Sequence, residues 1–215
     1  MKKPLNTVFI LIAGIIAMSA GLWLATLQTE QTQNTPRIQG AIYPQAKTIS
    51  PFSLLTHKNK TFTQSDFLND WGLIFVGYTH CPDICPTTLS LLNEVDKIYS
   101  EQNLDSVNIY FLSIDPERDS VDVMQQYINY FNENFTGLTG SMSEVNKLSS
   151  NLNAVYRKAP GLSGKITEDD YLMDHSSALM LINPDGKLQS ILTAPHSTNS
   201  IITSIITSQT YYKSL

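Results

Sequence analysis

The chain has few cysteines and few basic residues, and each scarcity excludes a class of protein. Cys81 and Cys85 are its only cysteines in 215 residues, which excludes a scaffold held together by several disulfides. Lys and Arg number 14 against 19 Asp and Glu, so the formal net charge is −5. Nucleic acids bind to basic surfaces, and the chain has no basic stretch with interleaved aromatic residues. We therefore predict no nucleic-acid partner.

Charge is missing altogether from residues 8–27, which are rich in Ile, Leu, Ala and Gly. As a helix this run would be about 30 Å long, which matches the hydrocarbon core of a bilayer. Lys2 and Lys3 precede the run and the next basic residue is Arg37, so the positive-inside rule keeps the N-terminus in the cytoplasm. The sequence therefore predicts a transmembrane helix within residues 1–27.

A cleaved signal peptide is the alternative interpretation of this run. Ala20 and Ala25 could end such a peptide, but Met18 and Trp23 stand two residues earlier, where a cleavage site needs another small residue. We therefore expect an uncleaved, single-pass anchor in a bacterial inner membrane, with the C-terminal domain in the periplasm. That compartment is oxidising, so the two cysteines should pair unless a reductant or a metal intervenes.

Residues 28–47 form a Gln-, Thr- and Asn-rich segment with Pro36 and Pro44 and little periodicity. This composition predicts a flexible linker that holds the remaining chain away from the membrane. The globular domain is then expected over residues 48–215, where strand-like and helix-like segments alternate.

The alternation in the globular domain predicts its fold class. Patterns of apolar residues predict strands over 52–55, 61–63, 73–78, 107–114, 178–182 and 188–192. Apolar stripes predict helices that contain 89–99, 124–131, 145–152 and 201–206. Ser143 is the expected N-cap of the third of these helices. Together these elements predict an α/β fold with a mixed central sheet flanked by helices.

Cys81 and Cys85 stand four positions apart, which points to local chemistry rather than to a structural staple. The C-x-x-x-C spacing suits a reversible dithiol couple or a soft metal such as Cu(I) or Zn, and a buried inert pair is the remaining alternative. Pro86 is tolerated only in the first turn of a helix, which places Cys85 at a helix N-terminus and Cys81 on the preceding loop. Such a loop lies at the carboxyl ends of strands, where sites in α/β sheets collect.

Two sulfurs make an incomplete site, and the chain offers four histidines as a third ligand. His80 should project from the opposite face of the strand end, and His57 and His196 are expected on the surface. His175 precedes the predicted strand over 178–182, so its loop could reach the cysteines. Two thiolates and an imidazole suit copper as Cu(I) or Cu(II). A histidine bonded into the loop backbone remains the alternative.

The carboxylates near these segments have simpler interpretations. Asp83 lies between the cysteines and is expected to orient the loop, because a hard carboxylate suits Cu(I) poorly as a ligand. Asp115, Glu117 and Asp119 surround a strand end and are expected to form a solvated turn with local ion pairs, rather than a second metal site.

Three segments of the chain resemble one known family, in the family's order. They are Gly77–Leu89, which reads GYTHCPDICPTTL, Ser113–Asp119, which reads SIDPERD, and Asp174–Ser177, which reads DHSS. These segments resemble the SCO/SenC family of copper chaperones over essentially the whole predicted domain. The turn His57–Lys60 departs from the family's usual Asp and Gly, at a position expected to lie far from the site.

The resemblance implies a thioredoxin-like fold and a mononuclear copper site made by Cys81, Cys85 and His175. It also implies that the protein delivers copper to the binuclear copper centre of cytochrome c oxidase subunit II, or reduces the cysteines there. A periplasmic copper carrier or a thiol reductase is then a further partner.

A thiol–disulfide oxidoreductase is the main alternative to a metallochaperone, and a thiol peroxidase is a third. Thioredoxin-like reductases usually carry a cis-proline just before the strand that faces their cysteines. This chain has His175–Ser177 there instead, which favours metal binding over substrate docking. We further expect the two cysteines to close into a disulfide when no metal is bound.

Overall fold

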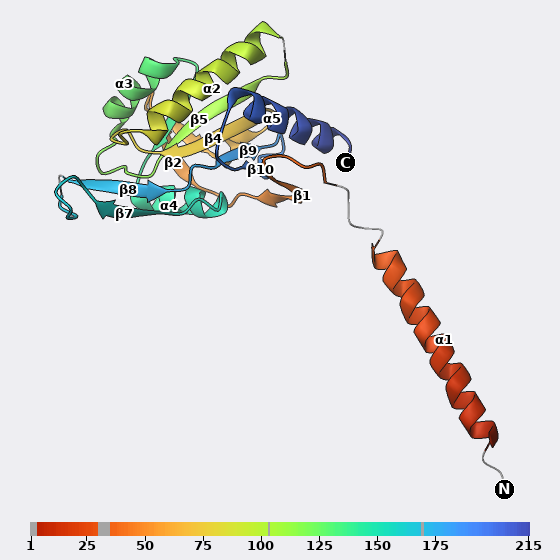
Figure 1. Ribbon diagram of the computed structural model, residues 1–215. Helices are drawn as coiled ribbons and strands as arrows, with labels where there is room; N and C mark the ends of the chain where they lie inside the picture. Colours follow the sequence, from red (N-terminus) through yellow and green to blue (C-terminus); the bar gives the residue numbers. More distant parts are fainter. Residues whose placement is uncertain (1–3, 30–34, 103, 169) are drawn as a thin grey trace. The chain divides into compact units, whose positions relative to one another are not determined.

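The computed structural model describes residues 4–29, 35–102, 104–168 and 170–215 (Figure 1). The chain divides into two units, Met1–Asn34 and Thr35–Leu215. The first unit contains helix α1 (Pro4–Thr29), so the helix expected over 8–27 is present, and the large apolar side chains described in it, from Val8 to Leu24, are exposed. Among the described residues, however, no helix is long and apolar enough to cross a membrane, and the predicted anchor is not confirmed.

The second unit is built around one mixed, eight-stranded sheet. Its strands are β1 (Gly40–Thr48), β2 (Ser53–Thr56), β3 (Thr61–Thr63), β4 (Trp71–Gly77), β5 (Val107–Ser113), β6 (Thr136–Thr139), β9 (Leu179–Ile182) and β10 (Lys187–Leu192). They lie side by side in the order β1-β10-β9-β4-β5-β6-β2-β3. The central strands β4, β5 and β6 run parallel, and the remaining neighbours pair antiparallel.

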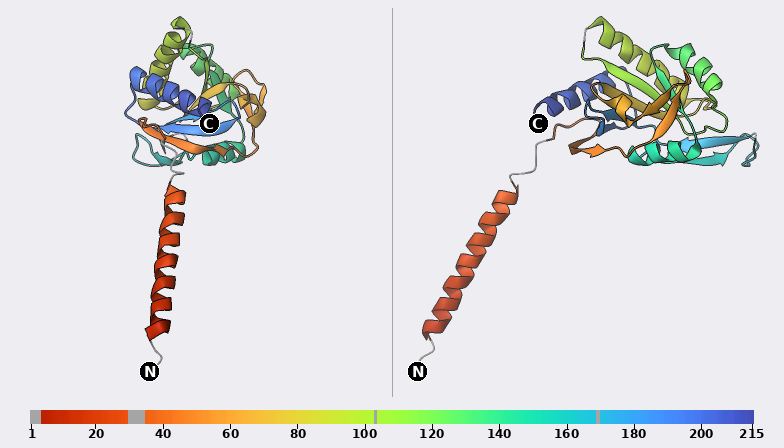
Figure 2. Two further views of the ribbon diagram at one scale, coloured as in Figure 1. Left: turned by 90° about the vertical axis from the view of Figure 1, so that its right-hand side faces the viewer. Right: turned by 180° about the vertical axis from the view of Figure 1, so that it is seen from behind.

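Helices cover both faces of this sheet (Figures 1 and 2). One face carries α2 (Ile84–Glu101), α3 (Val121–Phe131) and α5 (Thr198–Lys213). The other face carries α4 (Met142–Asn151) and a separate hairpin made of β7 (Tyr156–Pro160) and β8 (Tyr171–His175). A short 3₁₀ helix (Gln64–Phe67) follows β3. The predicted mixed sheet flanked by helices is confirmed.

Strand β4 shows why the sheet is covered on both sides. All seven of its residues are buried. Leu73 and Phe75 pack into the cluster under α2, α3 and α5, while Ile74 and Val76 pack into the cluster under α4 and β8. A strand buried on both faces reads as a continuous apolar run, which is how the sequence predicted it.

Several predicted boundaries differ from the structure. The predicted linker over 28–47 is wrong at its C-terminal end, because β1 begins at Gly40 and pairs antiparallel with β10. The linker's residues 30–34 lie outside the described residues. Strand β1 escaped prediction because it is an edge strand that contains Pro44, has an irregular register between Ile42 and Lys47, and buries only Ile42.

Other differences concern single turns and short strands. Helix α4 begins after Ser141, whose hydroxyl accepts a hydrogen bond from the Glu144 N–H, so the predicted N-cap Ser143 is wrong by two residues. Strands β6, β7 and β8 were not predicted from the sequence. Strand β6 has only four residues, and β7, which pairs with β8 alone, is largely exposed. Helix α3 begins after Ser120, whose hydroxyl accepts a hydrogen bond from the Val123 N–H.

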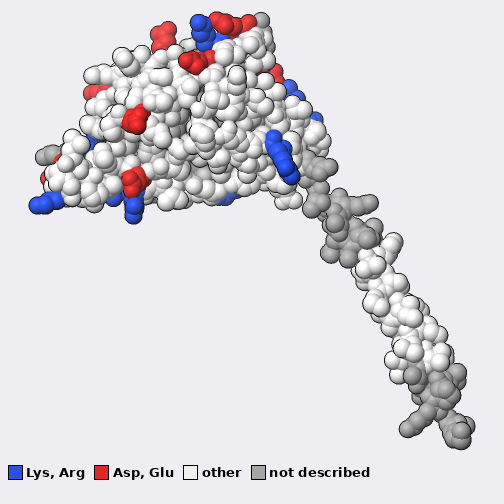
Figure 3. All heavy atoms as spheres, in the orientation of Figure 1, with Lys and Arg blue, Asp and Glu red and all other residues white. Residues whose placement is uncertain are grey.

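Charged side chains are sparse on the face of the molecule shown in Figure 3, and acidic and basic groups are interspersed there. Exposed ion pairs such as Lys97–Glu101 and Lys213–Asp105 are typical of such a surface. Pairs of this kind contribute at most about 1 kcal/mol each to stability, so burial of the two apolar clusters dominates the fold.

Candidate metal centre

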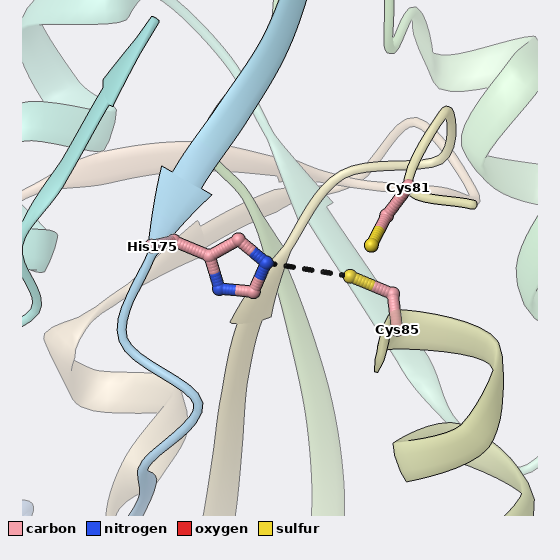
Figure 4. A group of neighbouring side chains, drawn as sticks. All are labelled: Cys81, Cys85 and His175. Carbon is pink, nitrogen blue, oxygen red and sulfur yellow. Dashed lines mark hydrogen bonds between the residues drawn. The ribbon is translucent and has the colours of Figure 1, made fainter. Parts of the chain in front are cut away.

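Three potential ligand side chains converge at the carboxyl end of β4 (Figure 4). Cys81 lies on the loop between β4 and α2, Cys85 in the first turn of α2, and His175 at the end of β8. Their ligand atoms all lie within 4.8 Å of one another. Within the described part of the chain, this is the one group of three or more His, Cys, Asp or Glu side chains placed to hold a metal ion.

Cys85 is fixed by its place at the helix start. It is the second residue of α2 and its side chain is fully buried. Its sulfur and the ring of Phe111 both lie so close to Gly77 that a side chain at position 77 would have no space. The free N–H groups and the dipole at a helix N-terminus stabilise negative charge, which helps this position to hold a thiolate once a metal ion has displaced the proton.

His175 is held in one orientation by the residue that follows it. Its Nδ1 lies 3.0 Å from the carbonyl oxygen of Ser176, so the ring proton is assigned to Nδ1, which donates to that oxygen. The lone pair of Nε2 then faces the cysteines, 3.6 Å from the sulfur of Cys85. The rings of Phe75 and Tyr78 lie edge-on to the imidazole, with centroids 6.3 and 6.1 Å away.

The two thiols have opposite proton affinities. A hydrogen bond from the Cys85 thiol holds the pKa of Cys81 far below that of a free thiol, and the backbone N–H groups of Asp83 and Cys85 act in the same direction against the effect of burial. The same bond, together with burial, raises the pKa of Cys85. Negative charge on the pair is therefore favoured at the half-buried Cys81 and disfavoured at the buried Cys85.

The donor set fits a soft metal ion such as copper. Thiolates hold Cu(I), and an imidazole allows the same site to hold Cu(II). Bonds of about 2.3 Å to sulfur and about 2.0 Å to nitrogen in a tetrahedral site would separate these two ligand atoms by about 3.5 Å. The observed separation of 3.6 Å between Cys85 Sγ and His175 Nε2 agrees with that value.

The acidic segment Asp115–Asp119 is not the solvated turn expected from the sequence. Asp115 and Asp119 are both fully buried, because several hydroxyl and N–H donors satisfy their oxygens. Burial raises the pKa of Asp119, and the bonds from Ser113 and Thr79 oppose that rise. None of these carboxylates belongs to a candidate metal group among the described residues. The exposed Glu117 does form an ion pair, with Lys158 at 2.7 Å.

The other three histidines lie away from the sulfurs. His80 is exposed and is not part of the ligand group, and its Nδ1 lies 3.0 Å from the hydroxyl of Thr79. His57 is not a surface residue as predicted, since it is buried and its Nδ1 accepts a hydrogen bond from the Gly137 N–H. His196 is half-buried and binds the carbonyl oxygen of Ser177 at 2.7 Å, so that prediction was wrong too.

Asp83 precedes α2, and its side chain forms no cap hydrogen bond. Its backbone N–H, rather than its carboxylate, faces Cys81. Sequence reasoning missed several residues that form hydrogen bonds within or to the ligand-bearing segments: Thr79, Arg118, Tyr171, Ser176 and His196. The first two and Ser176 stand inside the motifs quoted above, and that position was the available signal.

Comparison with known proteins places the chain in a family. The SCO1/SenC family model matches residues 41–209. The mouse protein named SCO2 homolog, mitochondrial, is 38% identical over 188 residues, which cover 85% of this chain and 71% of that protein.

Solved structures show the same relationship. Arabidopsis thaliana ScoI with copper bound is 32% identical with a TM-score of 0.66, over 74% of this chain and 96% of that one. Bradyrhizobium japonicum ScoI with copper bound is 31% identical with a TM-score of 0.63, over 78% and 100% of the two chains. The family model covers the sheet, both cysteines and His175, and the chain therefore belongs to the SCO1/SenC family.

Proposed function

We propose that this protein is a copper metallochaperone that binds one copper ion through Cys81, Cys85 and His175. The observation that carries the proposal is the convergence of two sulfurs and an oriented imidazole within 4.8 Å. Two family members with about the same fold have been solved with copper bound, which supports copper as the cargo. The acceptor that we propose is the binuclear copper centre of cytochrome c oxidase subunit II, as the family resemblance implies.

The three ligands have different tasks in loading and release. Cys81 is half-buried and has the lowered pKa, whereas Cys85 is fully buried, so Cys81 is the first contact for arriving copper. Cys85 must lose its proton as the metal binds, so loading releases about one proton per copper ion. On release, thiolates of the acceptor displace the chaperone's ligands one at a time, beginning at the accessible Cys81. His175 contributes the nitrogen that adapts the site to Cu(II).

The test is copper binding by purified, reduced protein. We expect one copper per chain and, with Cu(II), a sulfur-to-metal charge-transfer absorption. Cys81→Ser should abolish that absorption, and His175→Ala should weaken Cu(II) binding by a factor of ten or more while Cu(I) binding falls less. Unchanged affinity and spectrum in both variants would show that the ligand set is wrong.

The unequal thiols favour a second candidate function, thiol–disulfide exchange. A half-buried cysteine with a lowered pKa beside a buried cysteine with a raised pKa is the arrangement of an attacking and a resolving cysteine. Cys81 would attack a substrate disulfide to form a mixed disulfide, and Cys85 would then displace the reduced substrate and leave a Cys81–Cys85 disulfide. Such a reductase should keep most of its turnover in His175→Ala, whereas a chaperone should lose copper transfer. A peroxidase would instead consume peroxide, which a direct assay decides.

We also propose that α1 attaches the protein to a bacterial inner membrane, with the second unit in the periplasm and in reach of a copper carrier or thiol reductase. The support is the uncharged run over 8–27 and the exposed apolar side chains of α1, which mark a surface for lipid or protein. Cell fractionation followed by carbonate extraction tests this: the chain should stay in the membrane pellet. Recovery in the soluble fraction would refute the anchor and leave the copper site unaffected.

A further inference from the structure

The buried segment Asp115–Asp119, here called the acidic turn, touches both parts of the chain that carry the candidate ligands. It follows β5, which pairs with β4 in parallel, so the turn lies beside the loop that leaves β4. The Ile114 N–H donates to the Gly77 carbonyl at 2.9 Å and continues this pairing to the end of both strands. None of the turn's side chains is a candidate ligand, yet two of its acids are fully buried.

Asp119 holds the loop that carries Cys81. One carboxylate oxygen accepts the Thr79 N–H at 3.0 Å and the Ser113 hydroxyl at 2.6 Å, and the other accepts the Thr79 hydroxyl at 2.6 Å. Thr79 stands two residues before Cys81, so two of these bonds fix the start of the loop. Hydrogen bonds to a buried carboxylate are about twice as strong as neutral ones, which makes this a firm attachment.

Arg118 and Asp115 hold the strand that carries His175. Arg118 Nη1 donates to the carbonyl of Tyr171 at 3.1 Å, and the guanidinium lies over the Tyr171 ring, 3.6 Å from its centroid. Asp115 accepts the Tyr171 hydroxyl at 2.7 Å and also pairs with Arg118 Nε. Tyr171 begins β8 and His175 ends it, so these contacts fix the strand at the end opposite the ligand.

The β7–β8 hairpin needs such contacts because it lies outside the main sheet. Its two strands pair only with each other within the described sheet topology. An isolated two-stranded hairpin is marginally stable in water, so side-chain contacts must determine its position. The exposed Lys158–Glu117 pair contributes little, whereas the half-buried Arg118, stacked on the Tyr171 ring, can position the strand firmly.

We propose that the acidic turn is the positioning element of the copper site: Asp119 places Cys81 through Thr79, and Arg118 places His175 through Tyr171. These two connections are called the Asp119 arm and the Arg118 arm. This inference rests on the proposed function, since it assumes that these ligands bind copper. The turn joins two ligand-bearing segments that are 94 positions apart in the sequence, counted from Cys81 to His175. Loss of a residue that orients a ligand typically lowers metal affinity by about 10–100-fold.

The Arg118 arm is tested by a double-mutant cycle with His175. Arg118→Gln should weaken Cu(II) binding by about tenfold, and Cu(I) binding less, because the thiolates still hold Cu(I). In a His175→Ala background, Arg118→Gln should not weaken copper binding further, because Arg118 affects copper affinity only by orienting the imidazole. Arg157→Gln is the matched control: it removes an arginine of the hairpin itself, which pairs with Asp174 at the surface, and should leave copper affinity unchanged.

The Asp119 arm is tested by Asp119→Asn, which keeps the shape of the side chain and removes its charge. We expect about tenfold weaker binding of both Cu(I) and Cu(II), and faster alkylation of Cys81 in the metal-free protein because its loop is released. Asp66→Asn is the matched control, since Asp66 accepts the N–H and hydroxyl of Thr63 in the same way, after β3. If Asp119→Asn does not fold, Thr79→Val removes only the hydroxyl bond and should show the same effects to a smaller degree.

The possible outcomes distinguish a failure of this inference from a failure of the proposed function. If the unaltered protein binds no copper, the proposed function fails, and the alkylation rates still decide the Asp119 arm. If it binds copper but Arg118→Gln costs as much with His175→Ala as without it, the Arg118 arm is overturned. If Asp119→Asn and Thr79→Val behave like Asp66→Asn in both assays, the Asp119 arm is overturned.

Discussion

Gly77 is the residue on which the position of Cys85 depends. A Cβ at this site would lie 2.7 Å from the sulfur of Cys85 and 2.8 Å from the Phe111 ring, closer than atoms can approach. We therefore expect Gly77→Ala to destabilise the fold by about 1–3 kcal/mol, as overpacking does, and to displace the sulfur. Denaturant unfolding should show the first effect, and copper competition should show weaker binding by the folded protein.

Gly137 offers a matched control for this substitution. A Cβ there would lie 2.8 Å from both Ile128 and Met124, so the clash is similar but lies away from the ligands. Gly137→Ala should lower stability to a similar extent and leave copper affinity unchanged. Equal copper affinity in both variants would mean that Gly77 serves packing alone.

His57 should make stability depend on pH. Burial, and secondly the charge of Lys58, lower its pKa, and its Nδ1 must stay unprotonated to accept the Gly137 N–H at 3.0 Å. The unfolded chain takes up a proton below about pH 6.5 while the folded chain resists it, so stability is lost as the pH falls below that value. The loss is about 1.4 kcal/mol for each unit by which folding lowers the pKa.

Urea unfolding between pH 5 and 8 measures this effect. His57→Asn keeps an acceptor near the Gly137 N–H but does not titrate, so its unfolding free energy should fall less between pH 8 and pH 5 than that of the unaltered protein. The remaining histidines are common to both proteins and cancel in the difference. Identical pH profiles would contradict the assignment.

At the scale of elements, the junction between the β4 loop and α2 should act as a redox gate. Cys81 and Cys85 are both free thiols in the structure, and their sulfurs lie within the 4.8 Å ligand group. We expect mild oxidation of the metal-free protein to join them in a disulfide that binds copper far more weakly, because both sulfurs are then consumed. The closed loop is short, so the bond should add little stability and should be readily reduced.

Thiol titration before and after mild oxidation checks this prediction. The expected result is two free thiols per chain in the reduced protein and none after oxidation, with copper uptake restored by a dithiol reductant. Two thiols that persist after oxidation would rule out the gate, and copper loading would then need no reductase.

At the scale of the whole molecule, the boundary of the folded unit can be tested by truncation. A chain that begins at Thr35 keeps β1, and we expect its melting temperature to match that of the whole chain. A chain that begins at Ile49 lacks β1, exposes the edge of β10 and removes the Tyr43 carbonyl that the buried Gln189 amide donates to. Loss of that partner and of the buried Ile42 should cost about 2 kcal/mol or more.

Differential scanning calorimetry and light scattering measure the two consequences. The chain that begins at Ile49 should melt at a lower temperature and associate, because an open sheet edge pairs with other chains. If both truncated chains behaved alike, β1 would be dispensable and the linker predicted over 28–47 would describe the molecule better than the strand does.

Local features of the sequence determined much of this protein by themselves. The apolar run of β4 predicts a buried strand, because a strand that is covered on both faces is apolar throughout, whichever segments cover it. Pro86 predicts the start of α2 because proline is tolerated only in a helix's first turn, and the spacing of Cys81 and Cys85 follows from the chain itself. The motif around the cysteines was specific enough to indicate the family. Each of these features is determined by residues that lie close together in the sequence.

Only the tertiary structure decided which distant residues meet. His175 reaches Cys85 because β8 docks on the sheet, and nothing within β8 itself specifies that contact. His57, Asp115 and Asp119 read as surface residues in the sequence, yet each is buried because donors and acceptors from remote segments satisfy it. Burial of a polar group costs free energy unless it is paired, and its partner is known only once the chain has folded.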